Sequence, residues 1–105
     1  MDHLGNIGAV NLEDTIPLVC PCANSSGVPT APDAAPTWKI LNSAGTSIAN
    51  GTLSSTDSAS LTGVRTGTTT AAAASGFASG GVYAIVFSYA VSAQARSATA
   101  YVSVN

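Results

Sequence analysis

Residues 82–91 read VYAIVFSYAV, and this stretch decides the fold class. Its side chains alternate with a period of two, which indicates a β-strand rather than a helix. Large residues, among them Tyr83, Ile85 and Phe87, share one face, and small residues such as Ala84 share the other. Burying a large apolar side chain stabilises a protein by about 1.5–3 kcal/mol. We therefore expect the Tyr83 face to line the core and the opposite face to be flat and suited to contact with another subunit.

The rest of the chain repeats short alternating runs separated by Gly, Pro, Asn, Asp and Ser, and no segment sustains a helical period. This pattern is typical of a β-sandwich or a small barrel. Residues 95–104 are expected to form a hairpin with 82–91 through the short connection 92–94. Further strands are expected at 37–42, 47–53 and 58–65, a strand end followed by one helical turn at 68–74, and a loop at 24–36.

The predicted core collects apolar residues from these runs. Its members are Leu18, Cys20, Trp38, Ile40, Leu53, Leu61, Val64, Phe77, Tyr83, Ile85, Phe87, Val102 and Val104.

Residues 1–14 precede the predicted sandwich of residues 15–105. Their apolar side chains keep no strict period, and two glycines loosen the backbone. The segment is expected to be either the first strand of the sandwich or an arm that orders against a partner. The candidate partner-binding residues are Leu4, Ile7, Val10 and Leu12.

Charge excludes several classes of function. Charged residues make up 8% of the chain, and its cations are Lys39, Arg65 and Arg96. Three cations cannot neutralise the row of phosphates that a nucleic acid presents, nor form a polybasic membrane patch. Both arginines are expected to face solvent on strands and to discourage edge pairing. A weakly charged surface repels other molecules little, which favours a part that is docked in an assembly.

Reactive chemistry is not expected. His3 is the only histidine, which removes most routes to a catalytic triad or a three-ligand zinc site. The carboxylates are scattered, and Asp33 and Asp57 lie in turn-like contexts where they are expected to cap their own backbone. Cys20 and Cys22 are separated by one residue, too close for an unstrained disulfide, so both are expected to be reduced. The sequence predicts no enzyme, no cofactor and no metal.

The N-terminus has neither a basic segment nor the apolar run of a signal peptide. No stretch has the 18 apolar residues needed to cross a bilayer. The protein is therefore expected to be made in a cytoplasm and either to stay there or to leave as part of something larger.

The start of the central strand carries a further motif. Gly80-Gly81-Val82-Tyr83 places a tyrosine just after a glycine turn, which matches a tyrosine corner. Its hydroxyl is expected to reach back to a loop backbone group while its ring covers the edge of the core.

The order of features along residues 15–105 resembles the immunoglobulin-like β-sandwich modules of tailed-bacteriophage virion proteins. The features are Pro36, TWKILN (37–42), Ser43-Ala44-Gly45, Gly51-Thr52-Leu53, Asp57, Thr62-Gly63-Val64, Gly76-Phe77, Gly80-Gly81-Val82-Tyr83, Ala95-Arg96 and the closing Tyr101-Val102-Ser103-Val104. The resemblance implies an all-β, immunoglobulin-like antiparallel sandwich of about seven strands, and a structural role in a virion assembled in the host cytoplasm.

The resemblance does not say which part of the virion. The single small domain and its weakly charged surface favour a capsid decoration (cement) protein that binds the outer capsid surface and stabilises the shell. The alternatives are a head-fibre, neck or tail/baseplate component, or a carbohydrate-binding adhesion module using Trp38, Tyr89 or Tyr101. The expected partners are the major capsid protein or another virion protein, with a homo-oligomer as an open alternative and no nucleic acid or membrane.

Overall fold

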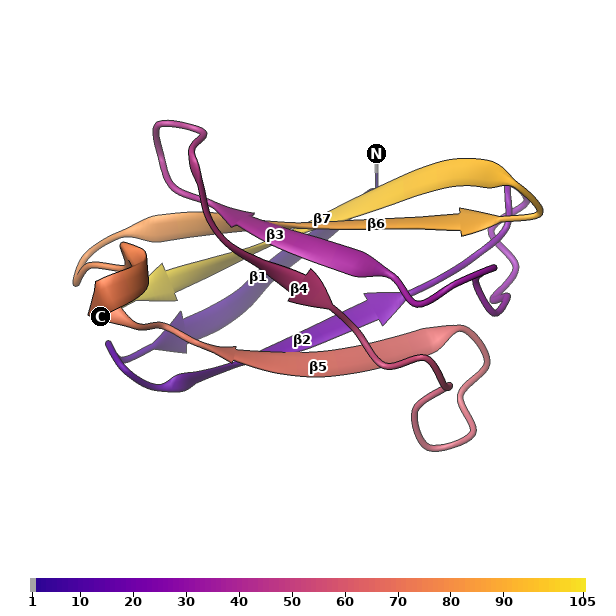
Figure 1. Cartoon of the computed structure of the whole chain (residues 1–105), viewed down its shortest axis with the longest axis horizontal. Coiled ribbons are helices and arrows are strands. Elements are labelled where there is room, and N and C mark those ends of the chain that lie inside the picture. Colours follow the sequence, from indigo (N-terminus) through magenta and orange to yellow (C-terminus); the bar gives the residue numbers. More distant parts are fainter. Residues whose placement is uncertain (1) are drawn as a thin grey trace.

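The computed structural model describes the backbone of residues 2–105 and the side chains of residues 5 and 7–105. Two sheets, in the strand orders β1-β7-β6-β3-β4 and β2-β5, form the two layers of a sandwich (Figure 1). The expected all-β sandwich of about seven strands is confirmed. Its elements are β1 (Asp2–Val10), β2 (Thr15–Pro21), β3 (Thr37–Leu41), β4 (Ser47–Thr52), β5 (Val64–Thr70), the 3₁₀ turn η1 (Ala73–Ser75), β6 (Val82–Val91) and β7 (Gln94–Val104).

The strand order corresponds to that of a variable-type immunoglobulin domain. In the larger sheet β7, β6, β3 and β4 take the places of the G, F, C and C′ strands, and β2 and β5 take those of B and E. One pair departs from the expected antiparallel arrangement, because β1 runs parallel to β7. The chain leaves β1 for β2 in the other sheet, so no hairpin turn imposes antiparallel pairing on β1.

The core lies between the sheets and uses the predicted face of β6. Tyr83, Ile85 and Phe87 are 5%, 0% and 1% exposed, so their inward orientation is confirmed. Two predicted core residues are not buried: Leu61 is 57% exposed, and Val64 is only half-buried. The other predicted members are buried, namely Leu18, Cys20, Trp38, Ile40, Leu53, Phe77, Tyr83, Ile85, Phe87, Val102 and Val104.

The tyrosine at the start of β6 behaves as the motif predicts. The Tyr83 hydroxyl accepts a hydrogen bond from the Ala78 backbone N–H at 2.7 Å. Its ring lies 4.7 Å from that of Phe77, centroid to centroid, at a tilt of 51°. The contact ties the loop after η1 to the core, and the predicted tyrosine corner is confirmed.

The β6–β7 hairpin closes through a two-residue turn made without glycine. Ser92 and Ala93 have φ angles of 51° and 64°, the left-handed pair that this turn geometry requires. The Asp33 carboxylate accepts hydrogen bonds from both of their N–H groups, at 3.1 and 2.8 Å. The hairpin is therefore confirmed, whereas the prediction that Asp33 caps its own backbone is wrong. Asp33 stabilises a turn that lies far away along the chain.

The strand predicted over residues 58–65 is largely absent from the segment between β4 and β6. Residues 58–63 form turns instead of a strand, and β5 begins only at Val64. The predicted strand end and helical turn at 68–74 are confirmed, because β5 ends at Thr70 and η1 follows.

Candidate functional site

The outer face of the larger sheet is the first candidate site. We call it the outer sheet face. Its lining from β3, β6 and β7 comprises Thr37, Lys39, Leu41, Val82, Ala84, Val86, Ser88, Ala90, Ser97, Tyr101 and Ser103. These residues lie opposite one another in register, as in the pairs Lys39–Val86 and Ala84–Tyr101, and all are exposed or half-buried.

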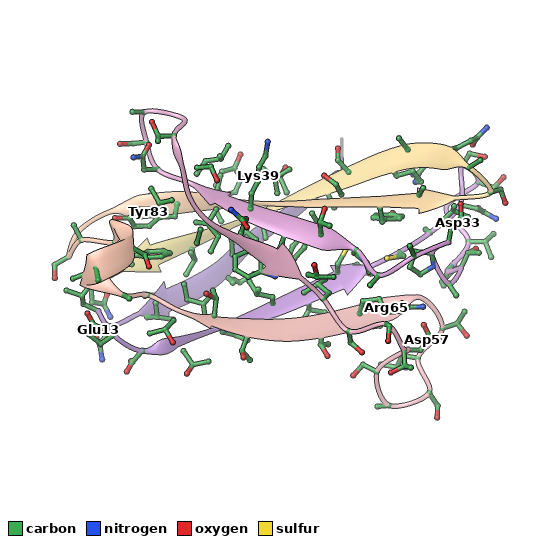
Figure 2. All side chains as sticks on the ribbon, viewed as in Figure 1. Glu13, Asp33, Lys39, Asp57, Arg65 and Tyr83 are labelled. Atoms are coloured by element: carbon green, nitrogen blue, oxygen red, sulfur yellow. The ribbon has the colours of Figure 1, made fainter. Side chains whose placement is uncertain are left out.

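The outer sheet face is weakly charged. Lys39 is its only charged side chain among the residues just named, and it points away from the smaller sheet (Figure 2). Most of the other side chains are small. Tyr101, the one aromatic residue among those named, is half-buried. Few charges would therefore have to leave water if a partner covered this face.

The four residues predicted to bind a partner from the N-terminal segment are placed differently from one another. Ile7, on β1, is 42% exposed. Val10 and Leu12 are partly buried and pack against the chain's own core. Leu4 lies outside the residues whose side chains are described. Of the three described residues, Ile7 offers the most exposed apolar contact.

A groove at one end of the sandwich was not predicted from the sequence. It has a volume of about 750 Å³ and is mostly apolar, with Cys22 in its lining and Arg96 as its charged member. The end of β2, the loop around residues 27–29, the turn before β5 and the start of β7 form it together. The lining residues are Pro21, Cys22, Ala23, Gly27, Pro29, Leu61, Thr62, Val64 and Arg96.

Backbone hydrogen bonds hold the walls of this groove together. The Cys22 N–H donates to the Gly63 carbonyl at 2.9 Å, and the Thr30 N–H donates to the Cys22 carbonyl at 3.1 Å. The Asn24 side chain accepts from the N–H groups of Ser26 and Val28 at 2.9 and 3.1 Å. These hydrogen bonds join the segments around residues 22, 30 and 63, so the groove is formed by the folded chain itself.

Leu61 lies on a turn of unusual backbone conformation at this groove. The two residues before it, Ala59 and Ser60, have φ angles of 50° and 63°. Left-handed conformations of this kind cost non-glycine residues free energy, about 1–2 kcal/mol each. The turn explains why Leu61 is exposed although alternation along 58–65 predicted a core position.

The prediction that Arg65, which lies next to the groove, faces solvent is wrong. Its side chain is buried rather than facing solvent, and its Nε donates to the Asp57 carboxylate at 3.0 Å. Nη1 also donates to the Ser54 carbonyl at 3.3 Å. Asp57 thus pairs with a buried cation instead of capping its own backbone, and the two side chains lie together near the turn before β5 (Figure 2). Arg96 is half-buried rather than fully solvent-facing.

The two cysteines are free and buried, and their Sγ atoms lie 3.9 Å apart. The prediction that Cys20 points into the core is confirmed. Burial raises the pKa of the Cys22 thiol, while the hydrogen bond to Cys20 and the charge of Arg65 act in the opposite direction. A raised pKa makes Cys22 a poor nucleophile near neutral pH.

The raised pKa of Cys22 predicts a loss of stability at alkaline pH. In the unfolded chain the thiol loses its proton at its ordinary value of 9.0, before the folded protein does. Deprotonation therefore favours unfolding as pH rises through that value, and the stabilising contribution is complete only below it. We expect the melting temperature to fall less between pH 8 and pH 10 in Cys22→Ala than in the parent protein, both kept reduced. Equal falls in both proteins would contradict this.

The remaining chemistry-bearing side chains do not converge. Among the side chains that the structure describes, those of residues 5 and 7–105, no three His, Cys, Asp or Glu are grouped so that they could hold a metal ion. Trp38 and Tyr89, two candidates for a sugar site, are only 8% and 7% exposed. The Tyr89 hydroxyl accepts a hydrogen bond from the Ala23 N–H at 3.2 Å. In the same part of the chain, no helix has the length and apolar character needed to cross a bilayer.

Comparison with known proteins yields no relative. The chain matches no model of a known protein family, no curated protein and no solved structure.

Proposed function

We propose that this chain is a structural protein of a tailed-bacteriophage virion. Within the virion, it acts as a capsid decoration (cement) protein that binds the outer capsid surface and stabilises the shell. The observation that carries this proposal is the outer sheet face, which has Lys39 as its only charge among its described lining residues. A surface with so few charges gives up little hydration when it docks.

Composition supports an assembled rather than a free state. With 8% charged residues and a formal net charge of −2, the chain has little electrostatic repulsion to keep its copies apart. Many copies on a symmetric shell need only weak individual contacts, because simultaneous engagement multiplies their effect. The family resemblance over residues 15–105 supplies the virion context, since a sandwich fold alone hosts many functions.

The partner in this proposal is the major capsid protein or another virion protein, and the chain acts by binding rather than by catalysis. A head-fibre, neck or tail/baseplate component would use the same fold and the same face. A carbohydrate-binding module is less well supported, because Trp38 and Tyr89 are buried and cannot stack on a sugar without a rearrangement of the core.

Fractionation of native particles tests the proposal. A tagged chain is expressed during infection by the phage that encodes it, and mature particles, separated tails and soluble protein are resolved on a density gradient. We expect the tag in the particle fraction, retained on heads after the tails are removed, and visible over the head surface when labelled particles are imaged. Recovery only with tails would favour the alternative, and recovery only as soluble protein would contradict a virion role.

A further inference from the structure

The free edge of β4 differs from the other sheet edges of the molecule. The larger sheet ends at β1 and β4, and β2 and β5 have the outer edges of the smaller one (Figure 1). An edge strand presents unpaired N–H and C=O groups, with which a strand of another chain can pair. Natural proteins prevent such pairing with prolines, charged side chains, bulges or covering loops.

Each of the other edges carries a protection of this kind. Pro17 and Pro21 lie on β2, and proline has no N–H to donate. The pairing of β1 with β7 is interrupted twice by irregularities of register. On β5 the Thr66 carbonyl already accepts a hydrogen bond from the Ser54 N–H at 3.0 Å, so the segment after β4 covers the early part of this edge.

The edge of β4 has little of this protection. Its sequence, SIANGT, contains neither a proline nor a charged residue. The irregularity in its pairing lies opposite Ile40 and Leu41, and residues 49–52 pair with β3 in a regular register. Asn50 and Thr52 are exposed. The second half of β4 is therefore a regular edge that is open to another strand.

One hydrogen bond fixes the direction in which the backbone groups of this edge point. The Leu53 N–H donates to the Pro36 carbonyl at 2.8 Å, and this pair continues the β3–β4 register by one position. Hydrogen-bonded and non-hydrogen-bonded pairs alternate along an antiparallel ladder. The N–H and C=O groups of Gly51 therefore face β3, whereas those of Asn50 and Thr52 face away from the sheet.

We propose that two copies of this chain pair through their β4 strands, antiparallel, about a two-fold axis at Gly51. In this register Asn50 of each copy lies opposite Thr52 of the other, and the outward N–H and C=O groups of both residues are exchanged between the copies. The two larger sheets then form one continuous sheet. This inference goes beyond the proposed function and does not depend on it, because the contact involves this chain alone.

Charge and size favour a second copy as the occupant. A two-fold contact brings each surface against itself, so a charged edge would repel its own copy, and β4 has no charge. Lys39, opposite Asn50, is one strand away. Its two copies would be at least three strand spacings apart, about 14 Å, which exceeds the Debye length of about 8 Å.

Gly51 suits the position on the axis, where the two backbones come closest. It brings no side chain there, and a Cβ at this position would lie 2.7 Å from the indole ring of Trp38. The core side of Gly51 is thus already filled by Trp38, and its backbone is left accessible at the edge.

A concentration series of the isotope-labelled full chain tests the pairing. The exchanged hydrogen bonds predict a weak dimer, with a dissociation constant on the order of 1 mM. We expect amide shifts that grow with concentration and are centred on Asn50, Gly51 and Thr52, together with a dimer in sedimentation velocity runs.

Charged variants test the register. The double variant Asn50→Lys/Thr52→Lys should weaken the dimer about tenfold or more, because like charges then lie directly opposite each other. Mixing it with Asn50→Asp/Thr52→Asp should restore a dimer, because opposite charges then face each other in both pairs. Val82→Lys/Ser88→Lys is the matched control, since it adds the same charge at exposed positions of the central strand β6.

The amide spectrum and the fluorescence of Trp38 confirm that each variant is folded, so that loss of the dimer is not mistaken for unfolding. A chain that stays monomeric at about 5 mM, well above the expected dissociation constant, would overturn the proposal. So would shifts centred away from β4, equal weakening by the two lysine pairs, or no dimer in the mixture of Lys and Asp variants.

Discussion

Replacing Phe87 with alanine is expected to lower the free energy of unfolding by about 3–5 kcal/mol, the usual cost of deleting a buried aromatic side chain. Phe87 is 1% exposed and lies in the middle of the larger sheet, opposite Trp38 on β3 and Ala98 on β7. Small domains have only about 5–15 kcal/mol of total stability, so this loss is a large part of the whole. Urea unfolding followed by the fluorescence of Trp38, the single tryptophan, measures it directly.

The same strand supplies the control for this prediction. Val82 lies on the opposite face of β6 and is 55% exposed, so Val82→Ala should change the free energy of unfolding by less than about 0.5 kcal/mol. A Phe87→Ala variant as stable as Val82→Ala would mean that the assigned inner face of β6 is wrong.

Gly63→Ala is expected to have the second large effect, a loss of about 2–5 kcal/mol from backbone strain and steric overlap together. Gly63 has a φ of +79°, and a Cβ added there would lie 2.5 Å from the Cys22 carbonyl oxygen and 2.8 Å from that of Thr30. Both neighbours are backbone atoms of the groove walls and cannot move aside as a flexible side chain could. The variant should therefore also loosen the groove, which amide hydrogen exchange at Cys22 and Thr30 would report.

Gly45→Ala separates the two causes. Gly45 has nearly the same φ, +81°, but a Cβ there would meet nothing within 4 Å. Its substitution should cost only the conformational strain, about 1–2 kcal/mol. If Gly63→Ala costs no more than Gly45→Ala, the close packing of the groove walls around Gly63 is contradicted.

Hydrophobic alternation was sufficient to predict the central part of the fold. The strand over residues 82–91 was predicted with its observed bounds, and the 37–42 and 95–104 predictions differ from β3 and β7 by one residue at one end. These runs have large side chains on one face and small ones on the other, so only one orientation buries the large ones. The pattern failed over 58–65, where the small residues alternate without a strong apolar face, and Ala59, Ser60 and Gly63 adopt left-handed conformations.

Side-chain interactions outside the regular strand pattern could not be predicted from sequence spacing. Arg65 is buried because Asp57 and the Ser54 carbonyl receive its guanidinium, and nothing local to either residue indicates that pairing. Asp33 lies 59 residues from Ser92, and its carboxylate accepts a hydrogen bond from the Ser92 N–H. In both cases a charged side chain that looks like a solvated surface residue instead satisfies backbone or charge elsewhere in the fold.

Of the two candidate surfaces, the outer sheet face could be predicted from the sequence and the groove could not. The outer sheet face follows from the alternation along β6, because a strand with its large side chains on one face has smaller side chains on the other. The groove does not follow, because its lining comes from four separated segments that only the folded chain brings together. The exposed position of Leu61 in particular contradicts its apolar character and requires knowledge of the turn.

A decoration role requires that this chain stabilise a capsid shell. Expanded shells of the encoding phage's major capsid protein, prepared without the chain, would be heated with and without purified chain, and binding would be quantified by sedimentation. A decoration role predicts saturable binding at a fixed number of copies per shell and a higher temperature of shell disruption. Shells that bind no chain, or that are disrupted at the same temperature with it and without it, would contradict the decoration role.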